Sequence, residues 1–129
     1  MARILVVDDE EADRAHGRAV LENAGHEVLF APSGEAALRI YAKQAVDLVI
    51  TDLAMPNLNG LRLIEQIRER DGRALIMAVS GVSPEQFDRA QALGAVATMA
   101  KPFSPEELLR VVSDALARTY SPPPDDLWR

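Results

Sequence analysis

The residues ILVVDDE at positions 4–10 carry an apolar run that ends abruptly in acidic side chains. The run at 3–7 is rich in β-branched residues, which is typical of a strand buried on both faces of a sheet. The segment that follows, up to Ala24, spaces its apolar residues as a helix does. It stops before Gly25, a residue type that favours the end of a helix. The start of the chain therefore predicts one strand followed by one helix.

The same strand-and-helix unit recurs four more times. Further short apolar runs lie at 26–30, 46–51, 74–79 and 95–100. Each precedes a stretch with helical spacing, and three of these stretches follow a serine that suits a helix N-cap: Ser33, Ser83 and Ser104. Buried strands that alternate with helices indicate a parallel sheet, because parallel strands need crossover connections. We therefore predict an α/β fold with a doubly wound five-stranded parallel sheet.

Composition and charge narrow the class of protein. The 129 residues suffice for one domain and contain no cysteine, which excludes a disulfide scaffold and thiolate chemistry. A formal net charge of −6 disfavours direct binding to nucleic acid, whose phosphates repel an acidic protein. No segment has the pattern of a leader or a membrane span, so we expect a soluble cytoplasmic protein. We expect the folded domain at 1–119 and a Pro-rich flexible tail, or the start of a linker, at 120–129.

Polar side chains stand where the predicted strands end. Asp8 and Asp9 follow the first strand, Asp52 the third, Ser80 the fourth and Lys101 the fifth. The carboxyl ends of parallel strands share one edge of the sheet, and ligands bind at that edge. Each of these residues alone is common at a turn or a helix start. Their occurrence together at four strand ends predicts a functional site.

The residue types suit the transfer of a phosphoryl group. Clustered carboxylates favour a divalent cation with oxygen ligands, of which Mg²⁺ is the usual one. A carboxylate can act as a nucleophile and form an aspartyl phosphate, while a lysine and a serine can hold phosphoryl oxygens. The chain has neither of the common glycine-rich nucleotide loops, so ATP is not the expected phosphate source.

Four segments give the sequence a family resemblance that covers about residues 2–118. They are ILVVDDE at 4–10, DLVITDLAMPNLNG at 47–60, AVSG at 78–81 and GAVATMAKPFSPEEL at 94–108. The chain resembles the receiver domain of two-component response regulators, a family that includes the single-domain chemotaxis regulators. The resemblance implies a flavodoxin-like (βα)5 fold with strand order 2-1-3-4-5.

The resemblance also implies a role for each site residue. Asp52 matches the phosphoacceptor. Asp8 and Asp9 match the acidic pair that binds Mg²⁺, with Asp9 as the direct ligand and Asp8 acting through water. Ser80 matches the switch hydroxyl, and Lys101 matches the lysine that pairs with the phosphate.

Three further expectations come from the same resemblance. The backbone carbonyl of Ala54 completes the metal ligands together with Asp52, and the bond between Lys101 and Pro102 is cis. The chain departs from the family at Thr98, where many members carry a switch Tyr or Phe. The usual rearrangement of the fourth helix and fifth strand on phosphorylation is therefore in doubt.

The expected function is phosphorelay signalling, as a phosphorylation-dependent protein-interaction switch and not as an enzyme. The phosphoryl donor would be a sensor histidine kinase or a histidine phosphotransfer protein, and the output an unknown downstream protein. One alternative is a phosphatase with an aspartate nucleophile, which usually needs a second acid where this chain has Ala54. Another alternative is an interaction module that never carries phosphate. The complete set of site residues disfavours it.

Overall fold

The computed structural model describes residues 1–55, 59–81 and 84–120. Within these ranges, strands and helices alternate along the chain as predicted. The strands are β1 (Arg3–Val7), β2 (Glu27–Ala31), β3 (Leu48–Thr51), β4 (Ile76–Ser80) and β5 (Ala97–Ala100). The helices are α1 (Glu11–Asn23), α2 (Gly34–Lys43), α3 (Gly60–Arg70), α4 (Pro84–Ala92) and α5 (Pro105–Leu116).

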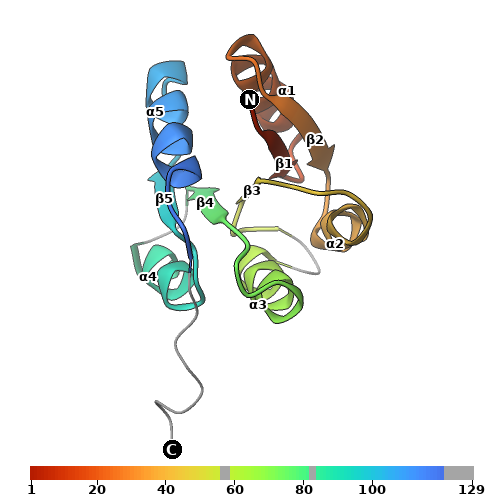
Figure 1. Ribbon diagram of the computed structural model, residues 1–129. Helices are drawn as coiled ribbons and strands as arrows, with labels where there is room; N and C mark the ends of the chain where they lie inside the picture. The colour runs from red at the N-terminus through yellow and green to blue at the C-terminus, as the bar shows by residue number, and fades with distance from the viewer. Residues whose placement is uncertain (56–58, 82–83, 121–129) are drawn as a thin grey trace, which may run out of the picture.

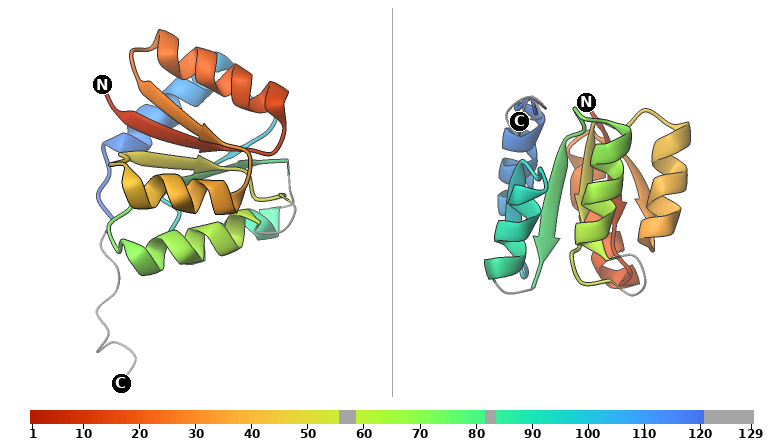
Figure 2. Two further views of the ribbon diagram at one scale, coloured as in Figure 1. Left: turned by 90° about the vertical axis from the view of Figure 1, so that its right-hand side faces the viewer. Right: turned by 90° about the horizontal axis from the view of Figure 1, so that it is seen from below.

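The strands form one parallel sheet in the order β2-β1-β3-β4-β5, which confirms the expected topology. Figure 1 shows α1 and α5 on one side of this sheet and α2, α3 and α4 on the other. The left view of Figure 2, which is turned so that the sheet is seen from its edge, shows the same three layers. The arrangement is the doubly wound fold that the alternation of apolar runs and helices predicts, with the flavodoxin-like strand order that the family resemblance implies.

The sheet separates two apolar cores. Leu63, Ile64 and Ile67 of α3 are fully buried on the face that α2, α3 and α4 cover. On the other face, Leu21 of α1 and Val112 of α5 are fully buried. Three methionines are also buried: Met55, Met77 and Met99. Because the strands are covered on both sides, polar residues are left to the sheet edges and strand ends, where the site lies.

Side-chain caps fix where helices begin. The hydroxyl of Ser33 accepts a hydrogen bond from the backbone of Ala36, and Ser104 accepts one from Glu107, each at 3.1 Å, so both predicted caps are confirmed. Ser83, the third predicted cap, lies outside the described residues. The structure adds Asn59, whose side chain caps α3.

Some strand boundaries differ from the prediction by two residues. Ala74 and Ala95 belong to predicted strands, yet they are buried residues of the loops that lead into β4 and β5. An apolar residue indicates burial and not strand structure as such. A buried loop residue next to a strand therefore looks like part of the strand in the sequence. Ser80 is the last residue of β4 and not the first after it, because it pairs with Ala100 of β5.

The tail predicted at 120–129 lies outside the described residues except for Tyr120. The guanidinium carbon of Arg68 lies 3.7 Å from the centre of the Tyr120 ring, a cation–π contact.

Candidate functional site

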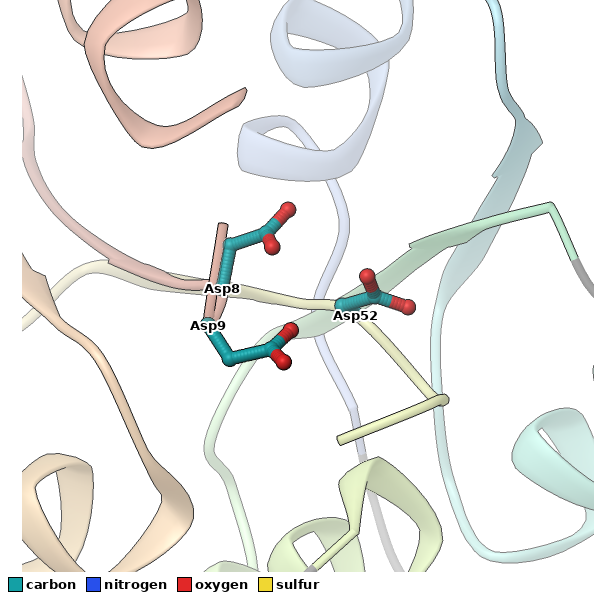
Figure 3. Close-up of side chains that lie close together, drawn as sticks. All are labelled: Asp8, Asp9 and Asp52. Carbon is teal, nitrogen blue, oxygen red and sulfur yellow. The ribbon is translucent and has the colours of Figure 1, made fainter. Parts of the chain in front are cut away.

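The predicted site residues meet at the carboxyl edge of the sheet. Asp8 and Asp9 follow β1, and Asp52 follows β3 between them and β4. Figure 3 shows the three carboxylates side by side at this edge. Ser80 at the end of β4 and Lys101 just after β5 both donate hydrogen bonds to Asp52. The structure therefore brings together all five side chains that the sequence singles out.

Asp52 is buried, and hydrogen bonds hold its carboxylate. The hydroxyl of Ser80 donates to its Oδ1 at 2.7 Å, and the backbone N–H of Ala54 donates to the same oxygen at 3.0 Å. The ammonium of Lys101 donates to Oδ2 at 3.1 Å. A buried carboxylate needs such partners, because burial without them penalises its charged form.

Lys101 is shared by three carboxylates. Its Nζ lies 2.7 Å from Asp8, 2.8 Å from Asp13 and 3.1 Å from Asp52. Partial burial lowers the pKa of Lys101, but hydrogen bonds to Asp13, Asp8 and Asp52 and the charge of Asp52 outweigh this effect, so its pKa lies above the ordinary value. The ammonium is therefore firmly protonated and offers its positive charge at the site.

The two acids after β1 differ in their surroundings. The carboxylate of Asp8 is buried and accepts the backbone N–H of Glu10 at 3.0 Å. The side chain of Arg14 donates to the backbone carbonyl of Asp8 at 2.7 Å, which ties this loop to α1. Asp9 is exposed. An exposed carboxylate beside two buried ones is free to exchange water for a cation.

The acidic cluster fits a hard divalent cation. Asp8, Asp9 and Asp52 each offer a carboxylate oxygen, and these oxygens lie within 4.8 Å of one another. Mg²⁺ is commonly bound by one or two carboxylates and completes its coordination with waters and a phosphate oxygen. Ala54 lies at the same place, two residues after Asp52, and its N–H contacts Asp52. The role of the Ala54 carbonyl as a ligand stays a prediction.

The loop after β3 is held by a close approach of α3. The backbone N–H of Gly60 donates to the carbonyl of Leu53 at 3.1 Å. A side-chain carbon at Gly60 would lie 2.1 Å from the carbonyl oxygen of Asp52, well inside contact distance. Only glycine permits this approach. Asn59 and Gly60 thus position the segment that carries Asp52.

Sequence reasoning misses Asp13, Asn59 and Gly60 as site residues. Asn59 and Gly60 could have been found from the sequence, because Asn–Gly before an apolar helical pattern is typical of a helix start. Asp13 has no such signal. It lies in the first turn of α1, and acids are common there for reasons that have nothing to do with a site.

The two histidines take no part in the hydrogen bonds of the site. The ring of His26 accepts a hydrogen bond from the backbone N–H of Ala2 at 3.1 Å, at the start of the sheet and away from the site. His16 lies nearer to the site, because its ring centre lies 5.8 Å from that of Phe103, two residues after Lys101. The contact shows that α1 packs beside the loop that follows β5.

The peptide bond between Lys101 and Pro102 is cis, as the resemblance implies. Thr98 lies in the middle of β5, opposite Ala78, and is half-buried. In the part of the chain that the structure describes, no helix is both long and apolar enough to cross a membrane.

Residues 4–113 match the family model of the response regulator receiver domain. This range contains every residue of the site described above. The chain belongs to this family. Receiver domains are phosphoacceptor switches of phosphorelay signalling that bind Mg²⁺ at an acidic pocket, and the chemistry expected from the strand-end residues agrees with that role.

Solved receiver structures superpose closely on this domain. The chemotaxis response regulator CheY4 of Vibrio cholerae is 32% identical, with a TM-score of 0.84, and the match covers 89% of this chain and 98% of that one. A putative response regulator of Chloroflexus aurantiacus is also 32% identical, with a TM-score of 0.86, and the match covers 91% and 98%. These likenesses confirm the fold over nearly the whole receiver domain.

Curated relatives carry a similar domain within longer proteins. The sensory/regulatory protein RpfC of Xanthomonas campestris is 35% identical over 91% of this chain but only 17% of its own length. The alkaline phosphatase synthesis transcriptional regulatory protein PhoP of Bacillus subtilis is 35% identical over 91% of this chain and 49% of its own length. The chain thus spans half or less of the length of these relatives.

Proposed function

We propose that this receiver domain accepts a phosphoryl group on Asp52. The observation that supports this assignment best is the set of contacts around that carboxylate. Asp52 is buried at the carboxyl edge of the sheet; Ser80 donates a hydrogen bond to its Oδ1, and Lys101 donates one to its Oδ2. A nucleophile that is held in place next to a cation needs little reorganisation to react.

The reaction is a displacement at phosphorus. An oxygen of Asp52 forms a bond to phosphorus, and the bond to the leaving group breaks. With a phosphohistidine donor, the electron pair returns to the ring nitrogen, which takes a proton from solvent. With acetyl phosphate, acetate leaves with the electron pair, and no proton is needed.

Lys101 and Ser80 can bind the oxygens of the phosphoryl group that is transferred to Asp52. Lys101 is a protonated point charge, suited to a phosphoryl oxygen that carries growing negative charge. The hydroxyl of Ser80 donates to Asp52 before reaction, and after reaction it can turn to a phosphoryl oxygen. That change of partner is the local event from which a switch would start.

Asp8, Asp9 and Asp52 would hold a Mg²⁺ ion in this scheme. The ion would supply positive charge that offsets the phosphoryl oxygens and the crowded carboxylates. The mixed burial of the three acids suits this role, since the exposed Asp9 is able to exchange ligands with solvent. The Ala54 carbonyl is the fourth proposed protein ligand.

We propose a sensor histidine kinase or a histidine phosphotransfer protein as the phosphoryl donor, and a downstream protein as the receiver of the signal. The chain's relatives include proteins named as sensors and as regulators, which supports a partner of this kind. An acidic chain without cysteine suits the cytoplasm, which is the location we propose. Turnover of a substrate is not part of the proposal.

Incubation with acetyl phosphate and Mg²⁺, followed by intact mass, tests the assignment. The wild-type chain is expected to gain one phosphoryl group, and Asp52→Asn is expected to gain none while keeping its fold. Asp47→Asn is a matched control, because Asp47 is an aspartate just before β3 that contacts Arg3 and no residue of the site. A phosphoryl group on Asp52→Asn would disprove the assignment.

The same assay tests the metal and separates the two alternatives. Asp9→Ala is expected to slow labelling strongly, and excess chelator is expected to do the same to the wild type. Full labelling in excess chelator would contradict the metal role. Rapid catalytic release of phosphate would favour the phosphatase, and a wild type that is never labelled would favour the module that carries no phosphate.

A further inference from the structure

Among the residues that the structure describes, Asp13 is hydrogen-bonded to the site through Lys101. Its Oδ2 accepts a hydrogen bond from the ammonium at 2.8 Å, as close as the contact from Asp8. Asp13 comes from the first turn of α1, whereas the other two acceptors follow β1 and β3. An ammonium has three protons, so these three carboxylates use its full donor capacity.

The three acceptors differ in their access to water. The side chain of Asp13 is 44% exposed, against 8% for Asp8 and 9% for Asp52. Asp13 is not one of the three acids whose oxygens cluster for a metal. Among the described residues, Lys101 is its one side-chain partner.

A phosphoryl oxygen at Asp52 needs one of these three protons. Lys101 must then lose its hydrogen bond to one of the three carboxylates. Which bond is lost depends on how well water can solvate that carboxylate afterwards. Water readily solvates the half-exposed Asp13, whereas the buried Asp8 pays a desolvation cost when it loses its partner. Asp52 gives up its carboxylate charge in the reaction, so it is not part of this comparison. Of the two acids that stay charged, Asp13 is therefore the one whose hydrogen bond to Lys101 is lost at the lower cost in free energy.

We propose that Asp13 is a positioning residue that restrains phosphorylation by holding Lys101 until a phosphoryl oxygen displaces it. The proposal rests on the phosphoacceptor role proposed for Asp52. The contact between Asp13 and Lys101 exists before the reaction and is lost in the transition state, so it stabilises the starting state and raises the barrier. On the loss of the phosphoryl group to water, which is a separate reaction, the contact has no such effect. Lys101 already holds the phosphoryl group in the phosphorylated form and keeps it through the transition state of hydrolysis.

Two rate constants of the Asp13→Asn variant test this idea. The rate constant for labelling by acetyl phosphate with Mg²⁺ is expected to rise about two- to fivefold, the range that fits loss of a partly exposed ion pair. The rate constant for loss of the phosphoryl group, measured after removal of acetyl phosphate, is expected to stay at the wild-type value. Both are measured by intact mass. Asp13→Ala serves as a second variant, and thermal melting confirms that each variant is folded.

Glu11→Gln is the matched control. Glu11 is the other acid in the first turn of α1, and it contacts neither Lys101 nor, within the described residues, any other cation. It is expected to label at the wild-type rate. Equal acceleration in Glu11→Gln would show a general effect of net charge and overturn the proposal.

The remaining outcomes are also decisive. Slower labelling of the Asp13 variants, or no change, would overturn the restraint and leave the role of Asp52 intact. An equal change in labelling and in phosphoryl loss would indicate a structural role and would overturn it as well. A wild-type chain that is never labelled at Asp52 would overturn both the proposed function and this inference.

Discussion

Tyr41 and Asp71 make one of the few hydrogen bonds between side chains away from the acidic site. The hydroxyl of Tyr41, near the end of α2, donates to Oδ2 of Asp71, just after α3, at 2.7 Å. Burial and this hydrogen bond raise the pKa of Tyr41 above its usual value. The same hydrogen bond, with one from the backbone of Arg73, lowers the pKa of Asp71. One hydrogen bond between side chains thus links the C-terminal ends of α2 and α3.

Tyr41→Phe is expected to lower the free energy of unfolding by about 1 kcal/mol at neutral pH, because it deletes this hydrogen bond. The pKa of Asp71 is lower in the folded chain than in the unfolded one, so the charged carboxylate stabilises the fold above the unfolded pKa of about 4. That contribution is lost as the pH falls through the lower, folded pKa. The difference between Tyr41→Phe and the wild type should therefore shrink under acid, as measured by urea unfolding at several pH values.

Tyr120→Phe is the control for this prediction. It keeps the aromatic ring that lies against Arg68, and no hydrogen bond of the Tyr120 hydroxyl occurs among the described residues. Its stability should match the wild type at every pH. An equal loss in both variants would assign the effect to tyrosine hydroxyls in general and not to the bond with Asp71.

At the scale of elements, the start of α3 and the loop after β3 behave as one unit. The first residue of α3, Gly60, lies against the backbone of Asp52 and Leu53, and Asn59 caps the helix with its side chain. The helix that covers the sheet therefore also sets the position of the proposed phosphoacceptor. A change at this junction should affect both stability and chemistry.

Gly60→Ala is expected to cost about 1–3 kcal/mol of stability, because the new methyl group overlaps the Asp52 carbonyl and α3 must move. Labelling by acetyl phosphate should slow at the same time. Gly17→Ala in α1 is the matched control, since a side-chain carbon there meets no atom within 4 Å. Alanine inside a helix is favoured over glycine, so Gly17→Ala should keep or raise stability. Chemical unfolding and the labelling rate measure both effects. A Gly60→Ala variant as stable as the wild type would contradict the close approach.

At the scale of the whole molecule, a local change at Asp52 must reach a surface that a partner can read. The hydroxyl of Ser80 is hydrogen-bonded to Asp52. Ser80 is also the last residue of β4, the strand that pairs with β5. Many family members carry an aromatic ring where this chain has Thr98. A β-branched threonine has few rotamers and little surface with which to follow a movement of Ser80. The change must then travel through the backbone after β3 and β4.

Amide NMR shifts on addition of beryllofluoride, a phosphoryl mimic, test this route. We expect large changes in the residues after β3 and after β4, and small ones in β5. Thr98→Tyr restores an aromatic ring and should extend the changes into β5. Large changes centred on residues 96–100 of the wild type would show that β5 does the switching without a ring.

The order of the elements and the membership of the site could be predicted from the sequence. Apolar periodicity is a local property, so runs such as 3–7 identify strands wherever they lie in the chain. Parallel strands bring their carboxyl ends to one edge, so residues that follow them, such as Asp52 and Lys101, must meet there. Strand boundaries could not be predicted, because buried loop residues such as Ala95 are as apolar as the residues of the strands.

Chain order and local pattern thus determined the α/β fold, the sheet edge that carries the site, and its five side chains. Only the tertiary structure decided which carboxylates share Lys101. Asp13 is 88 residues from Lys101 in the chain, and their contact depends on how α1 is rotated against the loop after β5. The close approach of Gly60 to Asp52 likewise depends on how α3 docks. Helix rotation and docking follow from the packing of the whole core, which no local pattern contains.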